Sequence, residues 1–190
     1  FAQAQEASFP KDVIKFSPEK FTFSTLELTW EHFKSADKSI SLYMQASTDA
    51  LYDDYTGGLL GVELKKYALP FSRNKKGKDY SHGLYGSVFL QGAYYQADDN
   101  DYYYDYVWDP NTQSYVYEYH DRGFDVMSVF PGITVGYQRT FWDVLFFEAF
   151  VGGGVRVGKI ISDHDYNNNY FSTIEFGYRG VMPRVGMRLG

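Results

Sequence analysis

Long stretches of this chain alternate between apolar and polar residues. The closing stretch has Val181, Val185 and Leu189 at odd positions, with Arg184 and Arg188 at even positions between them. Because successive side chains of a β-strand point to opposite faces, each such stretch has one apolar and one polar face. In a soluble fold the apolar faces need a second apolar layer, which this sequence hardly provides. The alternation therefore favours a closed barrel with its apolar face in lipid and its charged face inside.

The composition excludes several other classes of protein. No run of about 18 apolar residues exists, so no transmembrane helix is expected. A net charge of −6 and the lack of a basic stripe speak against nucleic-acid binding. The sequence contains no cysteine, which excludes disulfides, zinc-thiolate sites and a cysteine nucleophile.

The N-terminal residues Phe1–Ala4 look like the end of a signal segment with an A-x-A cleavage site. We therefore expect residues 1–11 to be a signal-peptide remnant and periplasmic leader, with an ordinary disordered tail as the alternative. Residues 12–190 are expected to form one domain.

The alternating stretches predict eight strands. They cover residues 12–17, 21–33, 39–50, 59–69, 82–96, 126–139 and 144–158, and the eighth ends the chain. With the N-terminus in the periplasm, connections 34–38, 70–81 and 140–143 are periplasmic, and 18–20, 51–58, 97–125 and 159–176 are outside. The expected fold is all-β: an eight-stranded antiparallel up-and-down transmembrane β-barrel with long extracellular loops and both termini periplasmic.

A soluble lipocalin-like barrel is the main structural alternative, since it also alternates but keeps its apolar residues inside. The glycines argue against it, because many share the parity of the charged residues: Gly132, Gly136, Gly152, Gly154 and Gly186. Glycines among large charged side chains are better suited to a crowded lumen than to a solvated surface.

Four strand patterns resemble a known group of proteins. They are Leu26–Glu31 (LELTWE), Gly132–Tyr137 (GITVGY), Glu148–Gly154 (EAFVGGG) and Pro183–Gly190 (PRVGMRLG). The chain resembles, over residues 12–190, the small eight-stranded outer-membrane proteins of Bacteroidota, a largely uncharacterised family. The resemblance implies recruitment to larger nutrient-uptake, secretion or barrel-assembly complexes. Such chains usually close on an aromatic residue, so we expect a few residues beyond Gly190.

Charged residues of the polar parity are expected to line the lumen. They are Lys15, Glu27, Glu31, Glu63, Lys65, Glu148, Arg156, Arg184 and Arg188. They should form a salt-bridge network, because an unpaired buried charge is costly. An eight-stranded barrel has room only for side chains, so we expect a plugged lumen. The alternative function for these charges is a proton or ion path.

Aromatic residues gather in two places. Near the expected periplasmic strand ends they predict an aromatic girdle at the headgroup level, comprising Trp30, Phe33, Tyr67, Phe71, Tyr137, Phe141 and Trp142. The alternative is the aromatic core of a soluble fold. Between residues 97 and 125 they flank a turn at Asp109–Asn111 and predict an extracellular interaction hairpin, comprising Tyr102, Tyr103, Tyr104, Tyr106, Trp108, Tyr115, Tyr117 and Tyr119.

Chemistry-bearing residues are few. Asp98–Asp101 could offer oxygen ligands to Ca²⁺, and Asp163–Asp165 with His120 could meet around a metal. We nevertheless expect both segments to be solvated acidic loops, and we expect no cofactor. A lipid A acyltransferase or deacylase would need a histidine beside a serine or an acid, and His120 near Ser114 is the candidate pair.

We therefore expect a non-enzymatic barrel in contact with outer-membrane lipid and lipopolysaccharide. It would be an accessory subunit of a larger envelope complex or a surface interaction protein.

Overall fold

The computed structural model describes residues 11–35, 37–47, 55–69, 83–109, 114–141, 145–161 and 180–190. Residues 1–10 of the expected signal remnant and leader, and residues 162–179, lie outside these ranges. The side chains of residues 23, 55, 69, 97–107, 109, 116–124 and 160 are also outside the description.

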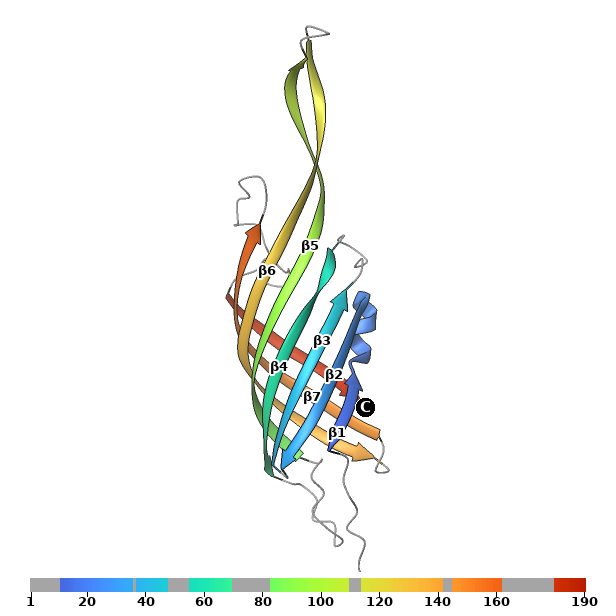
Figure 1. Ribbon diagram of the computed structural model, residues 1–190, viewed down its shortest axis with the longest axis vertical. Helices are drawn as coiled ribbons and strands as arrows, with labels where there is room; N and C mark the ends of the chain where they lie inside the picture. The colour runs from blue at the N-terminus through green and yellow to red at the C-terminus, as the bar shows by residue number, and fades with distance from the viewer. Residues whose placement is uncertain are drawn as a thin grey trace, which may run out of the picture.

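Within these ranges, eight antiparallel strands follow one another around a sheet that closes on itself as a barrel (Figure 1). The strands are β1 (Asp12–Phe16), β2 (Thr25–Ser35), β3 (Lys38–Ser47), β4 (Tyr55–Leu69), β5 (Gly83–Asp109), β6 (Ser114–Phe141), β7 (Leu145–Ile161) and β8 (Gly180–Leu189). A short 3-10 helix, η1 (Pro18–Phe23), lies between β1 and β2. The predicted all-β, up-and-down arrangement of eight strands is therefore confirmed.

Burial alternates along each strand with the period of two expected from the sequence. In contrast to a soluble barrel, most of the buried residues are polar and most of the large aliphatic residues are exposed. On β2, Glu27 and Glu31 are buried inside, whereas Leu28 on the same strand is exposed on the outer face. Ridges of Leu, Val, Ile and Met cover the outer wall from β2 to β8. Within the described residues, no helix is long and apolar enough to cross a membrane.

The strands β5 and β6 are much longer than the others and project beyond the barrel wall as a paired hairpin (Figure 1). Their register runs from Gly83 opposite Gln138 to Asp109 opposite Ser114, with an irregularity between Asp99 and Tyr103. Residues 97–125, expected to be a hairpin extension, are thus paired strands over most of their length.

The closure between β1 and β8 is short. Among the described residues, Phe16 of β1 is paired in register with Leu189 of β8. Beyond this pair, η1 lies against β8. The backbone N–H of Met187 on β8 donates a hydrogen bond to Glu19 Oε1 of η1 at 3.1 Å. The 3-10 helix therefore covers an edge that β1 is too short to pair.

The sequence predicts a tight turn at residues 18–20 and a second strand from Phe21, and this prediction is wrong. Pro18 instead starts a helical turn, because its fixed φ suits the first position of a helix and its missing N–H is not needed there. Ser24 ends η1 with a left-handed φ of 48°, and β2 begins at Thr25.

Candidate functional site

The lumen is filled with charged and polar side chains. Lys15, Glu31, Glu63, Glu148 and Arg188 each have 0 % of their surface exposed, although they come from β1, β2, β4, β7 and β8. Each occupies the inward face because it shares the parity of the buried residues of its strand.

The lower part of this network is built on Lys15 and Lys65. The Nζ of Lys15 lies 2.7 Å from Glu148 Oε2, donates to Gln138 Oε1 at 2.8 Å and also contacts Glu31. The Nζ of Lys65 lies 2.6 Å from Glu148 Oε1 and 3.4 Å from Glu31 Oε2. Two lysines therefore alternate with two glutamates, and each charge has neighbours of opposite sign.

Arg188 joins the remaining acids to this cluster. Its Nε lies 3.1 Å from Glu27 Oε1, and its Nη1 lies 3.2 Å from Glu63 Oε2 and 3.4 Å from Glu148 Oε1. A guanidinium has five donors in a fixed plane, which lets a single side chain bridge three carboxylates from three strands.

Arg184 lies four residues before Arg188 on β8, on the same face of the strand and among aromatic rings. Its guanidinium carbon is 4.3 Å from the centroid of Phe89, 4.8 Å from that of Tyr43 and 5.0 Å from that of Phe150. Its Nη1 is 3.8 Å from Glu63 Oε2. Cation–π contacts thus supplement the ion pair at this level of the lumen.

The structure brings eight of the nine expected lumen residues into one network: Lys15, Glu27, Glu31, Glu63, Lys65, Glu148, Arg184 and Arg188. These are four acids and four bases, so their formal charges cancel. The ninth, Arg156, lies toward the hairpin end of the lumen, with its guanidinium carbon 5.7 Å from the centroid of Phe130.

Neutral residues that the sequence did not single out complete the network. Ser87 Oγ and Thr134 Oγ1 donate to Glu63 Oε1 at 2.6 and 2.9 Å, and the hydroxyl of Tyr85 donates to Glu148. Like Gln138, these residues have the inward parity of their strands. The parity of these uncharged residues alone predicts that they face the lumen.

The girdle prediction is wrong for two residues. Phe33 and Tyr67 point into the lumen and are buried, and the Tyr67 hydroxyl donates to Glu31 Oε1 at 2.9 Å. Both have the parity of the lumen residues on their own strands, which excludes them from the outer face. Trp30 and Tyr137 do face outward, 39 % and 37 % exposed.

Phe141 lies at the end of β6, half-buried beneath the guanidinium of Arg139 at 4.9 Å. The two remaining girdle candidates, Phe71 and Trp142, fall outside the described residues.

The interaction hairpin is described in part. Trp108 and Tyr115 are opposite each other in the β5–β6 register, both exposed, with their rings in an edge-to-face arrangement at 5.2 Å. The side chains of Tyr102, Tyr103, Tyr104, Tyr106, Tyr117 and Tyr119 lie outside the described part.

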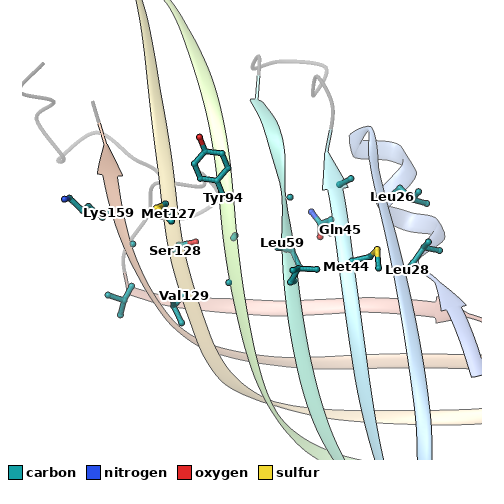
Figure 2. A pocket seen from close by; sticks show the side chains of 17 residues that line it. Leu26, Leu28, Met44, Gln45, Leu59, Tyr94, Met127, Ser128, Val129 and Lys159 are labelled. Atoms are coloured by element: carbon teal, nitrogen blue, oxygen red, sulfur yellow. The ribbon is translucent and has the colours of Figure 1, made fainter. Parts of the chain in front are cut away.

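The outer wall carries an open apolar groove of about 930 Å³ that crosses the strands from β2 to β7 (Figure 2). One side of it is a row of cross-strand neighbours formed by Met44, Leu60, Gly92 and Val129. Gly92 leaves the backbone uncovered there, since no described atom lies within 4 Å of a Cβ built on it. The groove is therefore a shallow indentation in an otherwise ridged apolar surface.

The candidate catalytic and metal residues cannot be assembled into a site. The side chain of His120 and the acidic residues 98–101 and 163–165 lie outside the described part of the chain. Among the described residues, no group of three or more His, Cys, Asp or Glu side chains is placed to hold a metal ion.

Comparison with known proteins identified no relative. No family model, curated protein or solved structure matches this chain.

Proposed function

We propose that this chain is a transmembrane β-barrel of a bacterial outer membrane with a sealed lumen, and that it acts through contacts at its outer surface rather than by catalysis or transport. The observation that carries the proposal is the inverted burial. Charged residues fill the interior, while large apolar side chains cover the outside of every strand from β1 to β8. Soluble monomers rarely expose contiguous apolar surface on this scale.

The height of the apolar surface supports a membrane location. On β6, outward-facing apolar residues run from Met127 to Tyr137, bounded by Asp125 and Arg139. Ten residue steps of about 3.4 Å, tilted by roughly 40°, correspond to a band about 26 Å tall. The apolar band of outer-membrane barrels is about 25 Å tall.

The filled lumen supports the absence of a transport role. Opening a path would require breaking ion pairs among fully buried charges, and each orphaned charge would cost several kcal/mol, on the order of 3–5. We therefore assign the buried charges of the lumen a role in the stability of the barrel.

Two surfaces of the protein could bind other molecules: the hairpin and the apolar groove. The hairpin presents the exposed rings of Trp108 and Tyr115 beyond the membrane, and the apolar groove lies at the level of the membrane. Exposed aromatic residues on a hairpin are effective contact residues, and small residues on a membrane-embedded wall permit close approach of another protein. An accessory role in a larger envelope complex would use both surfaces.

Membrane insertion is tested by expressing the chain behind a signal peptide in a Gram-negative host. We expect recovery in the outer-membrane fraction, a different electrophoretic mobility before and after boiling, and no steady conductance in planar bilayers. Recovery as a soluble periplasmic protein would refute the membrane assignment, and a stable open-channel conductance would refute the sealed lumen.

The interaction role is tested with photo-crosslinking residues placed at Tyr115 on the hairpin, at Leu60 in the groove and, as a control, at Val185, which is exposed on the outer wall away from the groove. We expect discrete adducts in whole cells from the first two positions and none from the third. Adduct levels at Tyr115 and Leu60 no higher than at Val185 would refute the role.

A further inference from the structure

One rim of the barrel carries a concentration of positive charge on its outer face. Lys34 on β2, Lys38 on β3 and Lys66 on β4 are all exposed and lie at the end of the barrel opposite the hairpin. Lys38 and Lys66 are direct cross-strand partners, and Lys38 also pairs in register with Ser35, next to Lys34. Three adjacent strands therefore each carry an exposed lysine at this rim.

The lysines mark the border of the apolar band. The next outward residue is Ile40 on β3 and Leu64 on β4, and these two are also cross-strand partners. On β2 the outward residues before Lys34 are His32 and the half-exposed Trp30, whose rings are 5.8 Å apart. The ammonium groups at this border would lie at the level of lipid headgroups, and Trp30, which is opposite Leu42, lies two outward positions further into the apolar band.

The protein only partly neutralises this charge. Asp37 in the β2–β3 turn accepts a hydrogen bond from Ser35 Oγ at 2.8 Å, which lowers the pKa of its carboxyl group, so it is ionised at neutral pH. The nearby Asp12 lies 2.8 Å from His32 Nδ1. The Asp37 carboxylate also interacts electrostatically with Lys38 and Lys66, but the three lysines and Asp37 still leave a formal charge of +2. Like charges directly opposite each other destabilise a strand pair, so a further anion beside Lys38 and Lys66 would be stabilising.

A notch adjoins the lysines. Lys66 is opposite Gly86 on β5, and Gly86 faces outward between Leu84 and Val88. No described atom lies within 4 Å of a Cβ built at Gly86. The charged rim therefore adjoins a gap beside Lys66, between the apolar side chains of Leu84 and Val88.

The other border of the band is different. Among the described residues of β4 to β7 at that end, the outward-facing ones are Thr56, Gln96, Asp125 and Lys159, and η1 adds Glu19 and Lys20. Their two cations and two acids cancel in formal charge, so these described residues form no comparable positive patch and the charge asymmetry distinguishes the two ends.

We propose that this rim binds an anionic glycerophospholipid, with its phosphate between Lys38 and Lys66, its headgroup near Lys34, and an acyl chain over the notch at Gly86. The inference rests on the proposed membrane location. With both termini in the periplasm, the rim faces the periplasmic leaflet, which makes a glycerophospholipid the occupant.

The test uses Trp30 as a local probe of lipid. The full chain, carrying Trp108→Phe and Trp142→Phe, is reconstituted into phosphatidylcholine vesicles in which part of the lipid is brominated phosphatidylglycerol or brominated phosphatidylcholine. Quenching of Trp30 then reports the relative binding of the two lipids beside the rim. Each lysine near an anionic headgroup contributes about a fivefold factor, so Lys38→Gln with Lys66→Gln should reduce the preference for phosphatidylglycerol by up to about 25-fold.

Lys159→Gln, which removes an exposed cation at the other border, is the matched control and should retain the preference. No preference in the parent protein, an unchanged preference in the double variant, or an equal loss in the control would each overturn the site. Preferential displacement of phosphatidylglycerol by lipid A would overturn the assignment to a glycerophospholipid.

The assay also separates this inference from the proposed function. Quenching by brominated phosphatidylcholine shows that a variant has inserted, whatever its lipid preference. Failure of the parent protein to be quenched by either lipid would refute the membrane location itself.

Discussion

Removal of one lumen charge should strongly destabilise the barrel. Glu148 is fully buried and lies 2.7 Å from Lys15, 2.6 Å from Lys65 and 3.4 Å from Arg188, and it also accepts a hydrogen bond from Tyr85. Glu148→Gln keeps the size of the side chain but leaves four bases facing three acids. Breaking a buried pair in this way costs about 3–5 kcal/mol, because a cation remains buried without compensation.

Urea unfolding in detergent micelles, followed by tryptophan fluorescence and by the boiling-dependent mobility shift, measures this cost. With a slope of about 2 kcal/mol per M, the midpoint should fall by roughly 1.5–2.5 M. Adding Lys65→Gln restores a balance of three acids and three bases, so Glu148→Gln with Lys65→Gln should be more stable than the sum of the two single changes predicts. A loss below about 1 kcal/mol for Glu148→Gln, or strict additivity in the double variant, would refute the view that charge balance stabilises the lumen.

Three further predictions concern other parts of the barrel. Gly136→Ala should lower the free energy of unfolding by about 1–3 kcal/mol in the same urea assay, because its new Cβ would meet the ring of Tyr85 in the lumen. Gly92→Ala on the outer wall should change that free energy by less than about 0.5 kcal/mol, and equal effects of the two substitutions would contradict the lumen packing. Glu19→Ala should speed amide exchange at Met187, because it removes the acceptor of that N–H, and Glu19→Gln should not; unchanged exchange in both would show that η1 does not protect the edge. Replacement of residues 98–123 by an Asn-Gly turn, which keeps Ala97 opposite Phe124, should leave insertion intact and reduce the adducts formed from the crosslinking residue at Leu60 if hairpin and groove contact one complex; unchanged adducts at Leu60 would show that the groove binds without the hairpin.

The girdle shows where sequence reasoning failed. Phe33 and Tyr67 lie near the ends of the predicted strands 21–33 and 59–69, and an aromatic residue near a strand end suggested a position at the membrane interface. Parity was the stronger constraint, because each residue shares its face with the buried glutamates of its strand. Trp30 and Tyr137, which have the opposite parity, face outward as expected.

Helix η1 could not be predicted from alternation. The alternating pattern begins at Phe21 in the sequence, yet residues 18–23 turn as a 3-10 helix that lies against β8. Its position depends on an edge of β8 that β1 leaves unpaired, and β8 is more than 150 residues away along the chain. Local propensity contains no information about such a distant edge.

The sequence by itself determined which residues lie on which face. A strand has a side-chain period of two, so the parity of each residue separates lumen from outer wall without knowledge of neighbouring strands. Only the tertiary structure decided which charges meet. Lys15 and Glu148 are 133 residues apart, and the stagger of the strands around the closed barrel brings them to the same height, where their opposite charges pair away from water.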